Sequence, residues 1–273
     1  MLMMGCVYFK DAPGKQKNVV PVYIDTLVKA SGQIGTLIGQ ILFGILADRL
    51  GRKRMYGVEL MIIITATCAS ALSGNLVSGF SVFTVLGIWR VILGLGIGGD
   101  YPLSAIITSE FATTKRRGAM MAAVFAMQGF GILTGCIVSI VLLSCFKQAV
   151  YTNQDNLDYV WRIAIGFGAI PGCIALYFRL TIPETPRYTM DVDNDVHRGA
   201  NDINKVSGNS HVKLAEKKQQ AENKATFRQF IQHFSKWNNF KILLGTSISW
   251  FALDVAFYGV NLNNGIILDA IGN

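Results

Sequence analysis

Six long apolar runs dominate this sequence, and each is close to or above the ~20 residues that an α-helix needs to cross a bilayer. They are residues 30–47, 56–72, 82–108, 119–145, 159–182 and 241–262. Only 15% of the residues are charged, whereas a soluble domain carries roughly 25%. The sequence therefore predicts an all-α polytopic membrane protein rather than a large soluble core.

The basic residues predict which loops face the cytoplasm. Lys and Arg gather at the ends of the apolar runs, so the net charge of +8 indicates membrane topology and not a nucleic-acid-binding surface. The loop beginning at Asp48, the loop around Arg116 and the hydrophilic stretch 187–241 together hold seventeen Lys and Arg residues. The connections on the opposite side hold six. We therefore expect those three loops to be cytoplasmic.

The stretch at residues 98–110, GGDYPLSAIITSE, interrupts the third run with polar residues. Asp100, Ser104 and Thr108 are spaced four apart, which places them in one stripe on a helix face. Pro102 bends a helix because it removes a backbone hydrogen bond. An acid at a kink in a membrane helix is typical of a transport or proton site. The alternative is a structural acid paired with a neighbouring helix, but the coincidence of Pro, Gly-Gly and Asp favours the site.

Glu59 and Arg90 are two of the other charges inside the runs, and Arg179 lies near the end of the fifth run. Glu59 is near the start of the second run and Arg90 is within the third. Arg90 and Asp100 are ten residues apart, ~15 Å along a helix axis, so they cannot pair directly in a straight helix. We expect Glu59 to be the partner of Arg90, in a pair that either gates the protein or is only structural.

Two other polar groups are candidates for binding. Gln128 lies in the middle of the fourth run, where a buried amide either caps a neighbouring backbone or contacts a substrate. Trp250, Asp254 and Tyr258 are spaced four apart in the last run and share one helix face over ~12 Å. An acid between two rings with polar tips favours a binding site over an aromatic packing ridge.

Glycines indicate where helices approach closely. Gly35 and Gly39 have the four-residue spacing of a close-packing pair. Residues 94–99 match Gly-x-Gly-x-x-Gly, but no strand precedes them, so helix packing explains them better than dinucleotide binding. The sequence GAIPG at 168–172 predicts a bend in the fifth run. Residues 212–224 could form a surface helix in an otherwise flexible linker.

Four motifs resemble those of known transporters. The sequence GILADRLGRKR at 44–54 is similar to the loop between helices 2 and 3 of the major facilitator superfamily. The stretch 98–110 resembles the signature of phosphate:proton symporters in fungi and plants. PETPRY at 183–188 looks like the fungal branch, and WFALDVAFYG at 250–259 is similar to that family's seventh helix. The resemblance covers essentially all 273 residues.

The resemblance implies twelve helices in two six-helix halves around a central site, with this chain reaching from the end of helix 1 through helix 7. Residues 1–182 would form the N-terminal transmembrane bundle, with helix 1 incomplete. Residues 183–240 would be a cytoplasmic central loop, and residues 241–273 the first helix of the C-terminal half.

The resemblance also implies a function, which is proton-coupled import of inorganic phosphate by alternating access, expected at the plasma membrane. The expected phosphate contacts are Tyr101, Gln128, Trp250, Asp254 and Tyr258. The residues expected to carry or gate protons are Asp100, Glu59 and Arg90. The residues of the expected cytoplasmic motif are Asp48, Arg49, Gly51, Arg52, Glu110 and Arg117.

The chemistry of the ion fits these residues. Dihydrogen phosphate carries acceptor oxygens, to which Tyr and Trp can donate, and P–OH groups, from which Asp254 can accept. Sulfate has no such proton at neutral pH, so an ionised acid would repel it. Protonation of Asp100 would cancel a charge that otherwise repels the anion, which would couple the two fluxes.

Two other functions on the same scaffold stay open. PETPR also resembles sugar carriers, so a sugar or glycerophosphodiester carrier is one alternative, and a non-transporting phosphate receptor is another. An enzyme is not expected, because no nucleophile–base pair appears. The five Cys and three His lack metal-ligand spacing, so we expect neither a metal nor another cofactor. The expected partners are phosphate, protons and the lipid bilayer.

Overall fold

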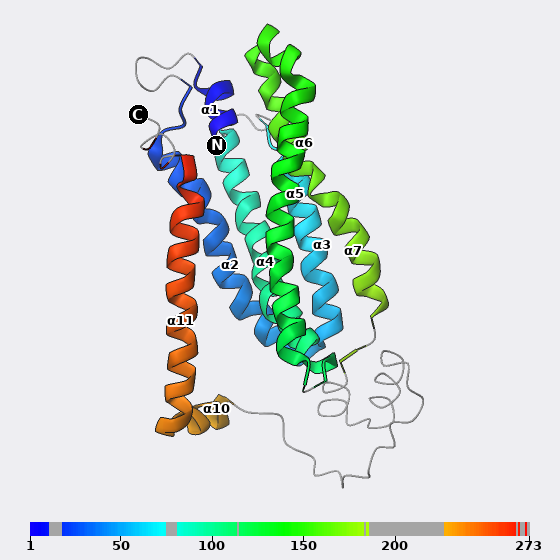
Figure 1. Ribbon diagram of the computed structural model, residues 1–273, viewed down its shortest axis with the longest axis vertical. Coiled ribbons are helices and arrows are strands. Elements are labelled where there is room, and N and C mark those ends of the chain that lie inside the picture. The colour runs from blue at the N-terminus through cyan, green and yellow to red at the C-terminus, as the bar shows by residue number, and fades with distance from the viewer. Residues whose placement is uncertain are drawn as a thin grey trace. The chain divides into compact units, whose positions relative to one another are not determined.

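The computed structural model describes residues 1–10, 18–74, 81–113, 115–182, 184–185, 227–265, 267 and 271, and the regular structure within them is helical (Figure 1). In chain order the helices are α1 (Leu2–Tyr8), α2 (Val22–Leu50), α3 (Arg52–Ala71), α4 (Val82–Phe111), α5 (Arg117–Thr152), η2 (Gln154–Asn156), α6 (Leu157–Phe167), α7 (Ala169–Thr181), α10 (Phe227–Phe234) and α11 (Trp237–Leu262). The chain divides into two compact units, Met1–Ala215 and Glu216–Asn273.

Five segments among the described residues are long and apolar enough to cross a membrane. They are α2, α4, α5, the segment Gln154–Thr181 and α11. Helix α3 is more polar because it begins with three basic residues and carries Glu59. It packs against α4 and α7, which places Glu59 within the bundle.

All six apolar runs form helices, but their ends differ from the prediction. Helix α2 begins at Val22, eight residues before the predicted run 30–47. Two polar residues there form a pair on the helix itself, since Lys29 contacts Asp25 one turn earlier at 2.5 Å. The predicted bend is confirmed, because Gly168 separates α6 from α7. The surface helix expected at 212–224 lies outside the described residues.

Helices α2 and α4 pack backbone against backbone through glycines. A Cβ atom added to Gly35 or Gly39 would strike a carbonyl oxygen of α4, and one added to Gly94 or Gly98 would strike a carbonyl oxygen of α2. Only glycine allows backbones to approach this closely. The helix-packing interpretation of both glycine motifs is therefore confirmed.

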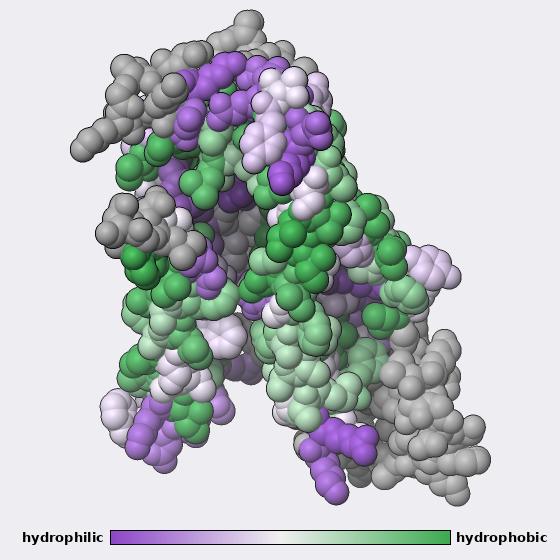
Figure 2. Space-filling model, turned by 45° about the horizontal axis from the view of Figure 1, so that its top comes forward, coloured by the Kyte–Doolittle hydropathy of each residue, from purple (hydrophilic) through white to green (hydrophobic). Residues whose placement is uncertain are grey.

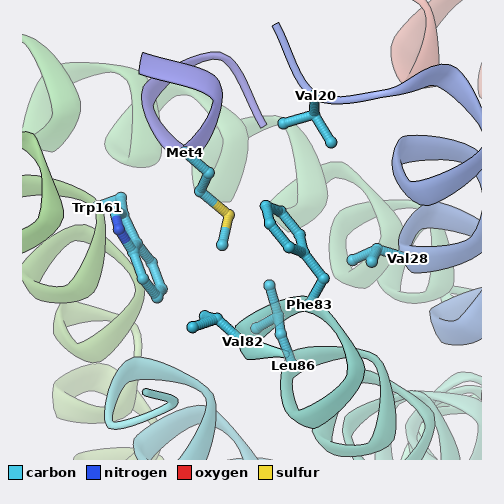
Figure 3. Close-up of a cluster of buried hydrophobic side chains, with 7 residues drawn as sticks. All are labelled: Met4, Val20, Val28, Val82, Phe83, Leu86 and Trp161. Atoms are coloured by element: carbon cyan, nitrogen blue, oxygen red, sulfur yellow. The ribbon is translucent and has the colours of Figure 1, made fainter. Parts of the chain in front are cut away.

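Buried apolar side chains form two clusters in the first unit. One joins α1, α2, α4 and α6 near the start of α4 and consists of Met4, Val20, Val28, Val82, Phe83, Leu86 and Trp161 (Figure 3). The other lies near the end of α2 and consists of Phe43, Ala47, Met55 and Leu103. The polar network described next lies on α3, α4 and α7, beside the second cluster.

The outer surface is apolar, as lipid requires. Helix α5 has no buried residue, although its mean hydropathy is high. Figure 2 shows apolar side chains along the helices and hydrophilic ones gathered mainly towards their ends. This distribution matches a bundle whose outward face contacts hydrocarbon rather than water.

Candidate functional site

Three charged side chains meet between α3, α4 and α7. Arg179 of α7 donates from Nη1 to Oε1 of Glu59 at 3.1 Å and from Nη2 to Oδ1 of Asp100 at 2.7 Å. Glu59 is completely buried, and the side chains of Arg179 and Asp100 are 15% and 35% exposed. One guanidinium therefore bridges an enclosed acid and an acid that still reaches open space.

Tyr56 and Ser104 complete this charge cluster. The guanidinium of Arg179 lies over the ring of Tyr56, 3.8 Å from its centroid, a contact that stabilises a desolvated cation. Ser104 donates to Oδ1 of Asp100 at 3.0 Å and lies 3.3 Å from the Tyr56 hydroxyl. The predicted polar stripe on α4 is thus confirmed for Asp100 and Ser104, which share a hydrogen bond one helical turn apart.

The glycine before Asp100 makes room for the buried acid. A Cβ atom on Gly99 would lie 2.8 Å from Oε2 of Glu59 and 2.7 Å from the ring of Phe43. Within the described residues, Oε2 of Glu59 has no hydrogen-bond partner. With both acids ionised the cluster carries one net negative charge, and a single bound proton makes it neutral.

The predicted pairing of Glu59 with Arg90 is wrong. Glu59 packs against Gly96 and Gly99, which lie six and nine residues beyond Arg90, about 9 and 14 Å further along α4. It is therefore level with Asp100, where Arg179 reaches it. Arg90 instead interacts electrostatically with Asp25 of α2.

Arg179 is the member of this charge cluster to which the sequence analysis assigns no role. It lies near the end of the fifth run. The available signal was a lone Arg among apolar residues of a membrane span, because such a charge needs a partner inside the protein.

The expected phosphate contacts lie in both units. In the first, Tyr101 is partly exposed on α4 and Gln128 is exposed on α5. In the second, Trp250 is exposed on α11, and Asp254 and Tyr258 are partly exposed one turn apart. Their contact with phosphate stays a prediction.

The expected cytoplasmic motif forms an ion-pair network where α2 meets α3. Arg52 pairs with Glu110 at the end of α4 and with Asp48 at 3.6 Å. Gly51 joins the two helices with φ 98°, a conformation that L side chains rarely adopt. The network extends to Glu184, which accepts a hydrogen bond from the Lys53 backbone at 3.0 Å.

The remaining two residues of this motif lie outside the network as described. Arg49 is an exposed residue in the last turn of α2. Arg117 begins α5, and its buried Nε has no hydrogen-bond partner within the described residues. The geometry therefore groups Asp48, Arg52 and Glu110.

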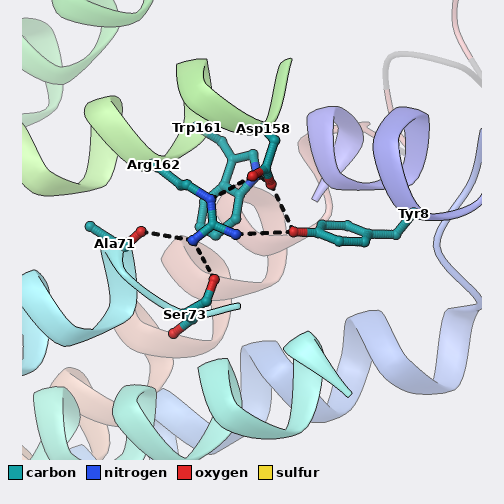
Figure 4. Close-up of polar contacts among 6 residues, drawn as sticks. All are labelled: Tyr8, Ala71, Ser73, Asp158, Trp161 and Arg162. Atoms are coloured by element: carbon teal, nitrogen blue, oxygen red, sulfur yellow. Dashed lines mark hydrogen bonds and ion pairs between the residues drawn. The ribbon is translucent and has the colours of Figure 1, made fainter. Parts of the chain in front are cut away.

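A second polar network, which the sequence did not predict, ties α6 to the opposite end of α3 (Figure 4). Arg162 donates from Nε to Oδ2 of Asp158 at 2.7 Å and from Nη1 to the carbonyl oxygens of Ala71 and Ser73. Tyr8 donates to the same carboxylate at 2.7 Å. Arg162 thus satisfies carbonyls at the α3 C-terminus that have no helical partner, which fixes α1 and α6 there.

Comparisons with known proteins identify the family. The model of the sugar (and other) transporter family matches residues 2–263. A repressible high-affinity phosphate permease of Neurospora crassa is 48% identical over 99% of this chain and 50% of its own length. An inorganic phosphate transporter of Saccharomyces cerevisiae is 42% identical over 99% of this chain and 49% of its own length. The chain spans about half the length of the curated relatives it matches.

Solved structures have the same fold. The proton:xylose symporter XylE of the major facilitator superfamily matches with a TM-score of 0.62 at 21% identity, over 75% of this chain and 44% of that one. A partially occluded inward-open form of XylE matches with a TM-score of 0.57. The predicted fold class is therefore confirmed. This chain belongs to the sugar (and other) transporter family and has the helical membrane fold of the major facilitator superfamily.

Proposed function

We propose that the protein to which this chain belongs imports inorganic phosphate together with protons by alternating access. The support is a charge cluster of one base and two acids inside the helix bundle, in a chain whose relatives in fungi are named as phosphate transporters. Ionisable groups within membrane bundles serve ion pathways and proton relays in transporters.

The proton would be carried by the Glu59–Arg179–Asp100 cluster. Asp100 is the partly exposed member, so it is the acid that would exchange protons with water, whereas Glu59 is enclosed. Proton binding neutralises the cluster and removes the repulsion on an approaching anion. Tyr101 follows Asp100 directly on α4, so the proposed proton and phosphate sites would be neighbours on that helix.

Phosphate would be held by Tyr101, Gln128, Trp250, Asp254 and Tyr258. The tyrosine and tryptophan groups donate to phosphate oxygens, and Asp254 accepts from a P–OH group. Arg90 is proposed as a gating residue of the same half. We propose that the protein lies in the plasma membrane, with the helices of residues 1–182 and 241–273 in the bilayer. The basic loops between those helices and residues 183–240 would lie on the cytoplasmic side.

A chimera tests this function. This chain replaces the matching residues of the Neurospora permease, and uptake of labelled phosphate is measured in cells deficient in phosphate transport. We expect uptake that unlabelled phosphate suppresses and that Asp254→Asn abolishes. Sulfate, sugars and glycerophosphodiesters serve as competitors. Suppression by a sugar or a phosphodiester at equal concentration, or full uptake by Asp254→Asn, would contradict the proposal, and binding without uptake would indicate a receptor.

A further inference from the structure

The short helix α10 has one apolar face. Phe230, Ile231 and Phe234 fall on the same side at helical spacing, while Arg228 and Gln232 fall on the other. Phe230 and Ile231 are 52% and 51% exposed. The rings of Phe230 and Phe234 lie 4.8 Å apart, so they form one continuous apolar edge at the surface of the second unit.

A hydrogen-bonded elbow fixes the angle between α10 and α11. Figure 1 shows α10 lying across the beginning of α11. Asn239 Nδ2 of α11 donates to the carbonyl oxygen of His233 at 3.0 Å, and Ser235 Oγ donates to the carbonyl oxygen of Ile231 at 2.8 Å. These bonds satisfy carbonyl oxygens at the α10 C-terminus that have no partner within the helix, and they hold that end of α10 in place.

The position of this elbow indicates what covers the apolar face. Helix α11 is long and apolar enough to cross a membrane, and we therefore expect its first residue, Trp237, at the membrane–water boundary. Trp237 is 69% exposed, as expected of an interfacial aromatic anchor. A helix that crosses a spanning helix at this level lies in the plane of the interface.

The charge of this segment selects a lipid class. Residues 227–241 contain Arg228, Lys236 and Lys241 and neither Asp nor Glu. Basic residues next to a membrane span are attracted to anionic lipid headgroups. The amphipathic face and the charge thus point to the same partner.

We propose that α10 is an interfacial helix that inserts Phe230, Ile231 and Phe234 at the headgroup–acyl boundary of an anionic leaflet, with Arg228, Lys236 and Lys241 at the headgroups. It anchors the start of α11 and sets the depth of that helix. The proposal is independent of the transported substrate.

Spin-label accessibility tests the insertion. The whole chain, with its five native cysteines replaced, is reconstituted into vesicles of phosphatidylcholine and phosphatidylserine. Labels are placed by Phe230→Cys and Ile231→Cys on the apolar face and by Gln229→Cys and Gln232→Cys as matched controls on the polar face. We expect the first pair to collide more with oxygen and the second pair more with a water-soluble nickel chelate. Equal chelate access at all four sites would overturn the proposal, and so would shielding of the first pair from both reagents, because protein would then cover the face.

Charge substitutions test the lipid class. A basic residue near an anionic surface contributes about 1 kcal/mol, which corresponds to about a fivefold change in a binding equilibrium. Arg228→Gln and Lys236→Gln are each expected to lower the ratio of inserted to free label at position 230 about fivefold in vesicles containing phosphatidylserine. Lys147→Gln, an exposed charge outside α10, is expected to leave it unchanged. Insertion that is indifferent to phosphatidylserine would overturn the assignment to anionic lipid.

Discussion

One guanidinium serves two carboxylates inside this bundle. Arg179 of α7 contacts Glu59 of α3 and Asp100 of α4, and the charges of both acids are neutralised by this one side chain. Removing one partner from a buried ion pair costs more than the pair itself contributes, because an uncompensated charge stays behind. Here two like charges would stay behind at close range.

Substitution Arg179→Gln is therefore expected to lower the free energy of unfolding by about 3–5 kcal/mol. The measurement is the thermal unfolding midpoint of the purified chain in detergent. Arg54→Gln is the matched control, since Arg54 is an exposed Arg of α3, and its effect should stay within about 0.5 kcal/mol.

Adding Glu59→Gln to Arg179→Gln should recover part of the loss, because one of the two facing carboxylates is then neutral. An additive double variant, or an Arg179→Gln variant as stable as Arg54→Gln, would show that the cluster is not held by charge. This rescue separates charge neutralisation from the packing that Arg179 provides over the ring of Tyr56.

The sequence could single out the two acids but not their base. Asp100 and Glu59 are conspicuous because carboxylates are rare in apolar runs. Their partner depends on the heights at which three helices pack, and the sequence of one helix does not determine those heights. Arg90 was the apparent candidate on the neighbouring run, whereas Arg179 comes from a helix 120 residues away in sequence from Glu59.

Glycines allow the helices α2 and α4 to pack closely against each other. In a membrane, helices gain little from excluding lipid, so close backbone contact supplies much of the packing energy. Gly39 and Gly98 each face a carbonyl oxygen of the opposite helix with no space for a Cβ atom. Gly44, also on α2, has nothing within 4 Å of an added Cβ.

Gly39→Ala is expected to destabilise the chain by about 1–3 kcal/mol, the cost of overpacking a tight interface. Gly44→Ala is the internal control and should be neutral or slightly stabilising, because Ala favours helix over Gly. Both are read from thermal unfolding under the same conditions. Equal effects of the two substitutions would refute the backbone contact between α2 and α4.

Apolar periodicity and glycine spacing predicted most of these elements. The six runs, the close-packing glycines and the break at Gly168 all follow from local chemistry, since each depends on neighbouring residues. The early start of α2 was missed because Asp25 and Lys29 look like a polar loop until their helical pairing is seen. The sequence does not predict the hydrogen bonds of Arg162, because they go to the backbone carbonyls of Ala71 and Ser73. Every residue has such a carbonyl, so no residue type marks the acceptor.

The proposed function depends on the whole molecule rather than on any one helix. The family places this chain among membrane transporters, and the chain spans about half the length of its curated relatives. The proposed phosphate contacts are shared between the two units, with Tyr101 and Gln128 in one and Asp254 in the other. The proposal of phosphate therefore rests on the likeness to phosphate transporters, and the proposal of proton coupling rests on the charge cluster.

The most direct test of proton–phosphate coupling is to measure whether phosphate drives protons into vesicles. The chimera with the Neurospora permease is reconstituted into vesicles that enclose a pH-sensitive dye, and phosphate is added outside. Both sides are buffered at a pH low enough that phosphate stays as dihydrogen phosphate and releases no proton of its own inside. We predict that the interior acidifies as labelled phosphate enters, and that Asp100→Asn abolishes this acidification. Phosphate accumulation with no acidification by the unsubstituted chimera would contradict the coupling of protons to phosphate through the Glu59–Arg179–Asp100 cluster.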